Sequence, residues 1–353
     1  KEQNGLEDWN SLEKIFLLPT NNHMIKKFVR PFAIRGIRAY FDLRFFWPIW
    51  YYVLNRKSCR LFLRNIPDLD GVGQRIAREL SQSGIAITHI DELFPGQNLL
   101  PVLQRYTQER IAAEATKMKK SKPFLEYMWD EMPTLEKDNP FIPFALDSRV
   151  LNIINTYLSL WSRFYYMTLN VTHPVSDGAD ARSSQRWHRD PEDKRQCKMF
   201  LYLFDVDKHA GPFTYMCHTT WGLKWGKYFR QQPPKGRYPE KGAIEQEIPK
   251  EEMMVCAGRA GTIIFCDTTG IHRGGYATQN ERIMFTAGYV TNASASPALF
   301  NCDTTFRQNT IFSPEARYAL AQHHTPLATY LYYRYKRMHR KKRSGDDMSV
   351  PHM

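Results

Sequence analysis

The chain has 353 residues, of which 42% are hydrophobic and 24% are charged, the composition of an ordinary globular protein. Its longest apolar run, residues 45–54, is about half as long as a bilayer-spanning helix requires, so no transmembrane helix is expected. No charged, apolar and small-residue sequence opens the chain, so no signal peptide is expected and the default location is cytoplasmic. Six cysteines without CxxC spacing argue against a zinc ribbon or a thioredoxin-like site and are expected to be reduced thiols.

The formal net charge of +13 is unevenly distributed. Seven of the ten residues at positions 334–343 are Lys or Arg. Residues 26–57 interleave arginines with Phe, Tyr and Trp, and they predict one or two amphipathic helices interrupted near Pro48. Both ends have the composition of segments that lie on an anionic membrane, so peripheral contact with such a membrane is one hypothesis. The alternative is a helical cap with aromatic residues in its core, followed by a solvated or RNA-attracting tail.

Helical patterns continue through the first half of the chain. Residues 71–84 place Val72, Ile76 and Leu80 at helical spacing and close on Gly84, a plausible C-cap. The next run, residues 85–90, predicts a strand. Residues 99–119 and 148–160 predict further helices.

After Trp161 the hydrophobic period becomes that of strands. Short β-rich runs, separated by Gly, Pro and Asp turns, occupy residues 164–171, 196–206, 212–217, 261–266 and 282–290. Helices first and strands later predict an α+β domain whose core is an antiparallel sandwich or jelly roll. The strand-poor segment 218–254, rich in aromatic and basic residues, is either a lid over a site or a solvated loop.

His188 and Asp190 form an HxD pair in the strand-rich half. Residues i and i+2 of an extended chain point to the same side, so both side chains can face one point. His272, between two predicted strands, can supply a third ligand. Two histidines and one carboxylate on one face of a metal are the facial triad of non-haem Fe(II) oxygenases. Arg282 begins the strand after His272, and its planar guanidinium suits a bidentate pair with a carboxylate.

A second HxD pair, His89 and Asp91, leaves an alternative in which His188 and Lys198 act as the later site residues. Helices are predicted around His89 where the strands of a jelly roll should be, so we favour the His188 pair. His209 and His218 flank the predicted strand 212–217 and are more typical of surface or core histidines than of ligands.

Three stretches resemble the phytanoyl-CoA dioxygenase-like family of Fe(II)- and 2-oxoglutarate-dependent oxygenases. They are Gln185-Arg186-Trp187-His188-Arg189-Asp190, Leu201-Tyr202-Leu203-Phe204-Asp205-Val206-Asp207 leading to Gly211-Pro212-Phe213, and Gly261-Thr262-Ile263-Ile264-Phe265-Cys266-Asp267 leading to His272 and Arg282. The resemblance covers about residues 71–290. It implies a double-stranded β-helix (jelly-roll, cupin-like) core with flanking N-terminal helices, and iron held by His188, Asp190 and His272.

The resemblance also implies the cofactors Fe(II), 2-oxoglutarate as co-substrate, and O2. It places the distal carboxylate of 2-oxoglutarate on Arg282, and it places Gln185 and Met167 along the co-substrate pocket. Because Asp190 supplies a carboxylate ligand, hydroxylation is favoured over halogenation. The chain has Arg273-Gly274-Gly275 where members often have Gly-Ser-Gly after the distal histidine, a departure that removes the small polar side chain usually found there.

The expected organisation is a basic and aromatic helical extension at 1–70, an oxygenase domain with helical support at 71–295, and a helical, polybasic extension at 296–353. The expected activity is hydroxylation of an unactivated C–H bond of an anionic small molecule, lipid or glycan. One alternative is a non-catalytic jelly-roll binding protein. Another is a nucleic-acid-directed oxygenase, but the strand after Arg282 lacks the second arginine associated with that group, so nucleic acid is not an expected partner. The sequence does not predict an oligomeric state.

Overall fold

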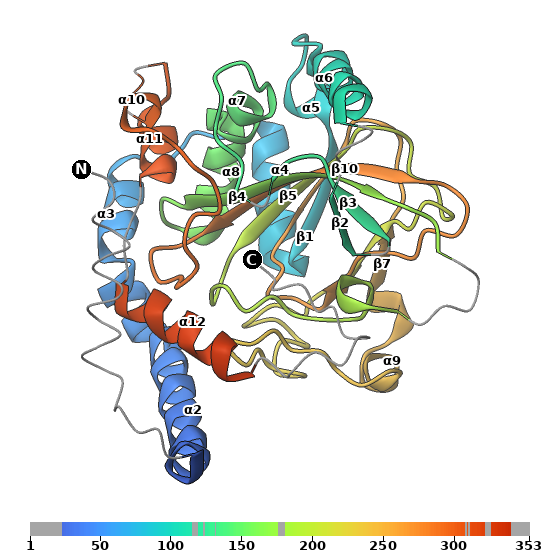
Figure 1. Ribbon diagram of the computed structural model, residues 1–353. Helices are drawn as coiled ribbons and strands as arrows, with labels where there is room; N and C mark the ends of the chain where they lie inside the picture. The colour runs from blue at the N-terminus through green and yellow to red at the C-terminus, as the bar shows by residue number, and fades with distance from the viewer. Residues whose placement is uncertain are drawn as a thin grey trace.

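The computed structural model describes residues 23–114, 119–122, 124–130, 132–175, 181–307, 309, 311–321 and 326–339. It combines helices with two antiparallel sheets (Figure 1), which confirms the mixed α+β class. The helices are α2 (His23–Phe45), α3 (Arg56–Arg64), α4 (Gly71–Ser83), α5 (Ile90–Leu93), α6 (Leu99–Glu114), α7 (Phe141–Ala145), α8 (Ser148–Leu158), α9 (Ala243–Glu247), α10 (Thr304–Arg307), α11 (Pro314–Leu320) and α12 (Pro326–His339). A π-helical segment, Ile49–Leu54, follows α2, and short 3-10 turns lie at Ser183–Gln185 and Lys250–Glu252.

The larger sheet has seven strands in the order β1-β8-β5-β10-β4-β3-β2. Its strands are β1 (Ile85–His89), β2 (Lys119–Lys122), β3 (Leu125–Tyr127), β4 (Arg163–Thr172), β5 (Cys197–Tyr202), β8 (Thr262–Cys266) and β10 (Arg282–Val290). The smaller sheet places β6 (Phe213–Met216) between β7 (Met253–Cys256) and β9 (His272–Arg273). One hydrophobic cluster joins the two sheets, with Tyr202 and Ile264 from the larger and Phe213 and Tyr215 from the smaller. Closure of these sheets into a double-stranded β-helix stays a prediction.

The predicted elements that lead to the site are confirmed. Helix α4 ends at Gly84, whose φ of +86° is the left-handed conformation of a glycine C-cap. The next strand, β1, is the edge strand of the larger sheet and pairs with β8. Strand β10 has the predicted bounds and lies between β4 and β5, so Arg282 begins a central strand.

Helices cover the outer face of the larger sheet (Figure 1). The main hydrophobic core lies between these helices and the larger sheet. It includes Leu80 of α4, Ile154 of α8 and Phe285 of β10. Trp50 belongs to this same core, and its indole N–H donates to Asp193 Oδ1 at 2.8 Å. The π-helical segment Ile49–Leu54 is therefore fastened to the strand-rich half, while the three predicted domain boundaries stay a prediction. All six cysteines are free, as their spacing predicts.

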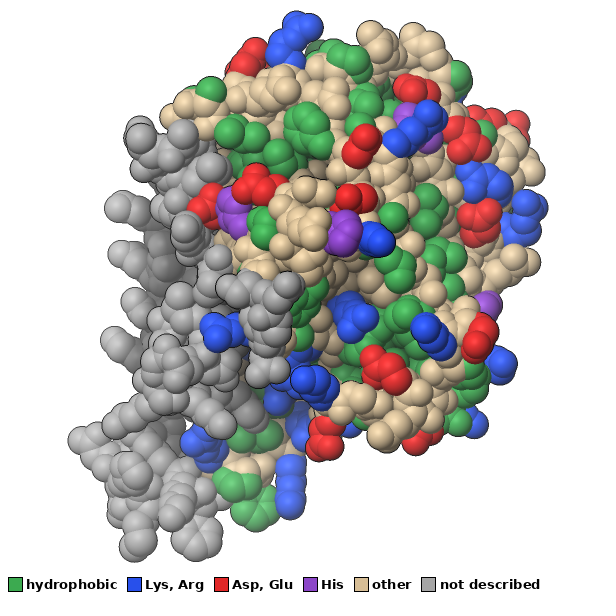
Figure 2. Space-filling view, turned by 90° about the vertical axis from the view of Figure 1, so that its right-hand side faces the viewer, with side chains coloured by type: hydrophobic (Ala, Val, Ile, Leu, Met, Phe, Trp, Pro, Cys, Tyr) green, Lys and Arg blue, Asp and Glu red, His purple; other side chains and the backbone are tan. Residues whose placement is uncertain are grey.

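Helices α2 and α12 pack against each other beside the sheets (Figure 1). Four aromatic residues from the two segments of the membrane hypothesis are buried in these contacts or in the main core. They are Phe41, Trp50, Tyr332 and Tyr335. This is the packing that the helical-cap alternative expects. Figure 2 shows hydrophobic side chains flanked by Lys and Arg at the lower end of the molecule. None of the described helices is long and apolar enough to cross a membrane, and residues 340–343 of the basic tail lie outside the described residues.

Candidate metal site

His188, Asp190 and His272 converge in the interior, with their ligand atoms all within 4.8 Å of one another. The Nε2 atoms of His188 and His272 each lie 3.6 Å from a carboxylate oxygen of Asp190. His188 and His272 face each other across a backbone pair, in which each amide N–H donates to the other carbonyl at 2.9 and 3.0 Å. The smaller sheet thus extends beyond β9 to the HxD segment, and the i, i+2 alternation aims His188 and Asp190 at one point.

Backbone carbonyls orient both imidazole rings. Nδ1 of His188 lies 2.8 Å from the carbonyl oxygen of Arg186, and Nδ1 of His272 lies 3.0 Å from that of Gly270. A hydrogen bond from Nδ1–H leaves the lone pair of Nε2 free to bind a metal. Burial lowers the pKa of His272 to about 3, with a further contribution from His188, so the ring is neutral, as a metal ligand must be.

The turn from Asp267 to Gly270 positions His272. Tyr157 donates to Asp267 Oδ2 at 2.6 Å, and Tyr215 donates to the Asp267 carbonyl at 2.8 Å. The amide of Gly270 donates to that same carbonyl at 2.9 Å. A Cβ at Gly270 would lie 2.0 Å from the Tyr215 hydroxyl, so glycine is required for this close approach. These contacts hold the turn whose Gly270 carbonyl orients the imidazole.

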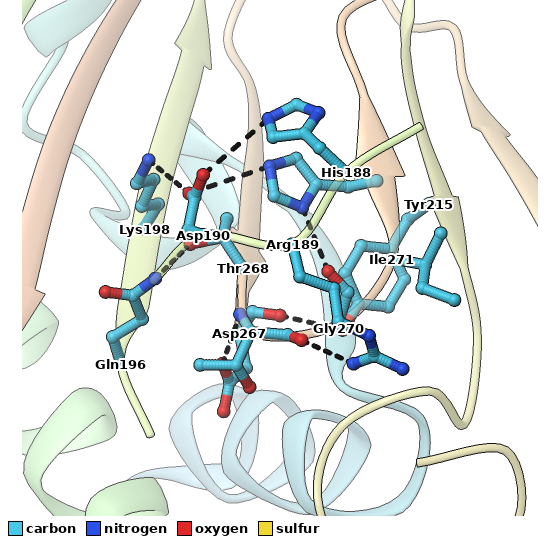
Figure 3. Close-up of polar contacts among 12 residues, drawn as sticks. His188, Arg189, Asp190, Gln196, Lys198, Tyr215, Asp267, Thr268, Gly270 and Ile271 are labelled. Carbon is cyan, nitrogen blue, oxygen red and sulfur yellow. Dashed lines mark hydrogen bonds and ion pairs between the residues drawn. The ribbon is translucent and has the colours of Figure 1, made fainter. Parts of the chain in front are cut away.

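The ammonium of Lys198 lies 2.6 Å from Asp190 Oδ2 (Figure 3). Burial alone would raise the pKa of Asp190, but attraction to Lys198, His272 and His188 outweighs it and holds the pKa well below its usual range. Burial lowers the pKa of Lys198, but attraction to Asp190 outweighs burial, so the pKa of Lys198 is raised well above its usual value. Asp190 is therefore ionised and oriented, which a carboxylate ligand requires.

The segment between β6 and β7 is fastened onto the site. Gln231 Nε2 donates to the carbonyl oxygens of Asp190 and Asp193 at 2.6 and 3.0 Å. Tyr238 stacks on His188, with ring centroids 5.2 Å apart and planes 8° apart. The segment is thus a cover over the triad in this structure, as the lid interpretation expects.

A cavity of about 210 Å³ lies beside the triad and is lined from both sheets. Arg282 lines it and is only 5% exposed. Its Nη1 donates to the carbonyl of Gly211, its Nη2 donates to the Thr172 hydroxyl at 3.2 Å, and its Nε has no partner among the described residues. Burial lowers the pKa of the guanidinium, and no carboxylate of the described chain offsets this. An anionic group in the cavity would supply the missing partner.

Glycines let the chain pass close to Arg282. Gly211 has φ of +68°, and a Cβ there would lie 2.5 Å from the Ala277 amide nitrogen. A Cβ at Gly275 would lie 2.2 Å from the Pro212 carbonyl oxygen. At Gly274 a Cβ would lie 3.5 Å from the Ser184 carbonyl oxygen and 3.9 Å from Arg282 Nη2, so a small side chain in this position would contact the guanidinium without a clash. Ser184, whose carbonyl accepts from the Gly274 amide at 2.8 Å, lines the cavity there.

Gln185 and Met167 both lie at the cavity, but in different ways. Gln185 is buried, and its Nε2 has no partner among the described residues, so it can donate to a ligand. Met167 packs in the main hydrophobic core behind the cavity wall. Its neighbour Thr168 and the paired Thr286 lie on the opposite face of the sheet from Met167. A role for Met167 beside a co-substrate stays a prediction.

The remaining histidines lie outside the triad. Nε2 of His89 lies 2.8 Å from the Ala260 carbonyl at the end of β1. Helix α4, predicted before His89, is present and the unpredicted α5 follows His89, although β1 itself joins the larger sheet. His218 pairs with Glu252 at 2.5 Å. His209 contacts Thr278 at 3.5 Å.

No model of a known family matches the chain, and no curated protein does. Among solved structures, the epimerase SnoN, in complex with Fe3+, alpha ketoglutarate and nogalamycin RO, is 13% identical with a TM-score of 0.46, over 62% of this chain and 84% of SnoN. EctD from S. alaskensis, with 2-oxoglutarate and 5-hydroxyectoine, is 14% identical with a TM-score of 0.45, over 70% of this chain and 86% of EctD. AviO1 from Streptomyces viridochromogenes Tue57 is 12% identical with a TM-score of 0.43, over 65% of this chain and 98% of AviO1. Membership of the phytanoyl-CoA dioxygenase-like family stays a prediction.

Proposed function

We propose that this chain is an Fe(II)- and 2-oxoglutarate-dependent oxygenase of the phytanoyl-CoA dioxygenase-like group, which hydroxylates an unactivated C–H bond. The observation that carries the proposal is one cavity holding both a buried His188–Asp190–His272 triad and the incompletely paired guanidinium of Arg282. Two neutral imidazoles and one carboxylate are the donor set of non-haem Fe(II) oxygenases. When bound, Fe(II) couples oxidative decarboxylation of 2-oxoglutarate by O2 to oxidation of the substrate.

In this proposal the residues of the chain divide the work of binding. Arg282 binds the distal carboxylate of 2-oxoglutarate, and the free Nε2–H of Gln185 supplies a further donor in the same cavity. Lys198 keeps Asp190 ionised and fixes the direction of its carboxylate. Gln231 and Tyr238 hold the covering segment against the triad and help to exclude water.

The alternatives are less well supported. In a non-catalytic binding protein, nothing would require a complete metal-ligand triad next to an arginine without a carboxylate partner. A nucleic-acid-directed oxygenase is disfavoured because the strand after Arg282 lacks the second arginine associated with that group. The binding-protein alternative predicts that 2-oxoglutarate is not turned over. The nucleic-acid alternative predicts that nucleic acid stimulates the turnover of 2-oxoglutarate.

The test is conversion of 2-oxoglutarate to succinate by the purified full chain with Fe(II), O2 and ascorbate and without any added substrate. Slow uncoupled turnover is expected in the wild type. The His272→Ala variant should show none, and His218→Ala, a histidine outside the triad, should match the wild type. If the wild type binds Fe(II) but produces no succinate above the His272→Ala background, the proposal is wrong.

A further inference from the structure

Glu192 is a buried carboxylate on the wall of the cavity. It is only 5% exposed, and its Oε2 accepts no hydrogen bond from any described residue. The oxygen without a partner has lost the water that it would otherwise bind, and leaving its hydrogen bond unmade is unfavourable. The free oxygen therefore calls for a hydrogen-bond donor from a molecule in the cavity. This inference rests on the proposed function, because it concerns the substrate of that same site.

The strand register separates Glu192 from the Arg282 end of the cavity. Arg282 pairs with Thr172 on β4, whereas Gly288 pairs with both Tyr166 of β4 and Lys198 of β5. Tyr166 and Thr172 are six residues apart, or roughly 20 Å along an extended strand. Lys198 lies over the Tyr166 ring at 5.3 Å, and Glu192 interacts electrostatically with both of these residues. The cavity thus has a cationic end, suited to 2-oxoglutarate, and a second end at Glu192.

The groups around Glu192 favour a neutral donor over a cationic one. Lys198 and Lys336 already place positive charge beside this carboxylate. Asp190 adds a negative charge, so the two lysines balance the two carboxyl groups and leave no excess negative charge to attract an ammonium group, whereas a hydroxyl group needs none. Aromatic side chains line the same cavity, and their faces suit the C–H faces of a ring. These side chains are Tyr127, Trp129, Tyr165 and Tyr166.

We propose that Glu192 is a specificity-determining residue that accepts a hydrogen bond from a hydroxyl group of the primary substrate, and that this substrate is a neutral, hydroxyl-rich molecule such as a sugar or a cyclitol. This replaces the anionic substrate that the net charge predicts. The basic residues that carry that charge lie largely outside the cavity, whose wall contains two lysine or arginine side chains, Lys198 and Arg282.

The test uses the full chain and a defined panel of small molecules. The neutral members are glucose, galactose, N-acetylglucosamine and myo-inositol, and the charged members are glucosamine and glucuronate. Binding is measured by saturation-transfer NMR on the metal-free protein, and stimulation is measured as succinate formation with Fe(II), 2-oxoglutarate and O2. At least one neutral member should bind and stimulate turnover, and neither charged member should do so as strongly.

Glu192→Gln is the decisive variant because it keeps the size of the side chain and removes its charge. It should raise the KM or Kd for the active neutral compound roughly tenfold or more, a larger change than in the KM for 2-oxoglutarate. Glu126→Gln, which alters a buried glutamate outside the cavity lining, is the matched control and should bind the compound like the wild type. Thermal unfolding of each variant shows that it is folded, and Glu192→Asp provides a second, charged variant with a shorter reach, for which weaker binding is also expected.

Several results would overturn the inference. One is binding and stimulation by the amine or the acid alone, and another is the absence of both for every neutral member. An unchanged KM in Glu192→Gln and Glu192→Asp would reject the role of Glu192. Uncoupled turnover of 2-oxoglutarate in the wild type separates these failures from a failure of the proposed function, since it does not depend on the primary substrate.

Discussion

The Lys198 ammonium and the Asp190 carboxylate form a buried ion pair of 2.6 Å at the edge of the candidate metal site. Burial favours the protonated form of Asp190, and Lys198 is the largest influence against it. A protonated carboxylate does not bind a metal, so iron and protons compete at this residue. The pair therefore keeps the site ready for iron at neutral pH.

Replacing Lys198 should make iron binding more sensitive to acid. In Lys198→Met the pKa of Asp190 rises, so half-saturation with Fe(II) at a fixed concentration should move to higher pH, with roughly tenfold weaker binding at pH 6. Lys198→Arg keeps the charge and should stay near the wild type. Anaerobic titration with Fe(II) at several pH values gives the measurement. Tighter iron binding in Lys198→Met at every pH would mean that Lys198 mainly repels the metal.

Arg282 should control 2-oxoglutarate more than iron. Arg282→Ala removes a charge-assisted pair and leaves a carboxylate unpaired in a secluded cavity, so the Kd for 2-oxoglutarate should rise roughly 10- to 100-fold. Arg282→Lys should recover only part of this, because an ammonium cannot form the two parallel hydrogen bonds. Calorimetry of the metal-loaded, anaerobic protein measures both affinities. An unchanged affinity for 2-oxoglutarate would move the assignment to Lys198.

His173, directly after β4, should make the folded state less stable as the pH rises. Burial opposes its charge, but hydrogen bonds and charge from Glu281 and Glu126 raise its pKa above the ordinary value. Nδ1 lies 2.6 Å from Glu281, and Nε2 lies 3.0 Å from Glu126. The pKa of His173 in the folded state exceeds its unfolded value of about 6.5. The stabilisation that protonated His173 gives to the folded state is therefore complete below about pH 6.5 and is lost as the pH rises through the folded pKa.

The measurement is the Tm of the wild type and of His173→Gln between pH 5.5 and pH 9, on the metal-free protein. The difference in Tm between them should be largest at the acid end and shrink toward pH 9. His209→Gln is the control and should show no such trend. A difference that grows with pH would have the wrong sign for this account.

Attachment to an anionic membrane stays a prediction, and the structure restricts the surface that could mediate it. Phe46, Tyr52, Val53, Leu63 and Ile66 are exposed along α2 and α3 and the π-helical segment between them. Exposed basic residues stand among them: Arg56, Lys57, Arg60 and Arg64. Co-sedimentation with vesicles of acidic lipid should exceed that with neutral vesicles and should fall as salt increases.

The double variant Leu63→Ser, Ile66→Ser should weaken this co-sedimentation, while Val102→Ser, at an exposed apolar position of α6, should not. A chain ending at Thr329 is a poor test of the basic tail, because it also removes Tyr332 and Tyr335 from the packing of α2 against α12. A chain ending at His339 is the better comparison. Equal and negligible binding to both vesicle types would reject membrane attachment.

Local sequence patterns predict the elements that carry the site, because those patterns depend on residues close together in the chain. Strand β10, helix α4 and its glycine cap, and the HxD pair all have signals of this kind. Tyr238 and Gln231 were not predicted as site residues, since their contacts with His188 and Asp190 join segments about 40 to 50 residues apart. Glu192 has no distinguishing local signal, and only the folded structure places it on the wall of the cavity beside the triad.

The aromatic residues of the N- and C-terminal segments show a second reason why sequence patterns do not predict the whole structure. A row of Phe, Tyr and Trp with arginines predicts an amphipathic surface, but it does not say whether the apolar face meets a membrane or another helix of the same chain. The cluster that contains Phe41 and Tyr332 depends on packing between residues nearly 300 positions apart. No periodicity within either segment carries that information.

The central claim is that His188, Asp190 and His272 hold iron in the cavity that also binds 2-oxoglutarate. It is tested most directly by anaerobic titration of Fe(II) into the full chain with 2-oxoglutarate, with the bound iron counted and the visible charge-transfer absorption of the chelate recorded. We expect one iron per chain and the absorption band in the wild type and in His89→Ala, and the loss of both in His188→Ala, Asp190→Ala and His272→Ala. Retention of iron and of the band in those three variants, or their loss in His89→Ala, would contradict the account.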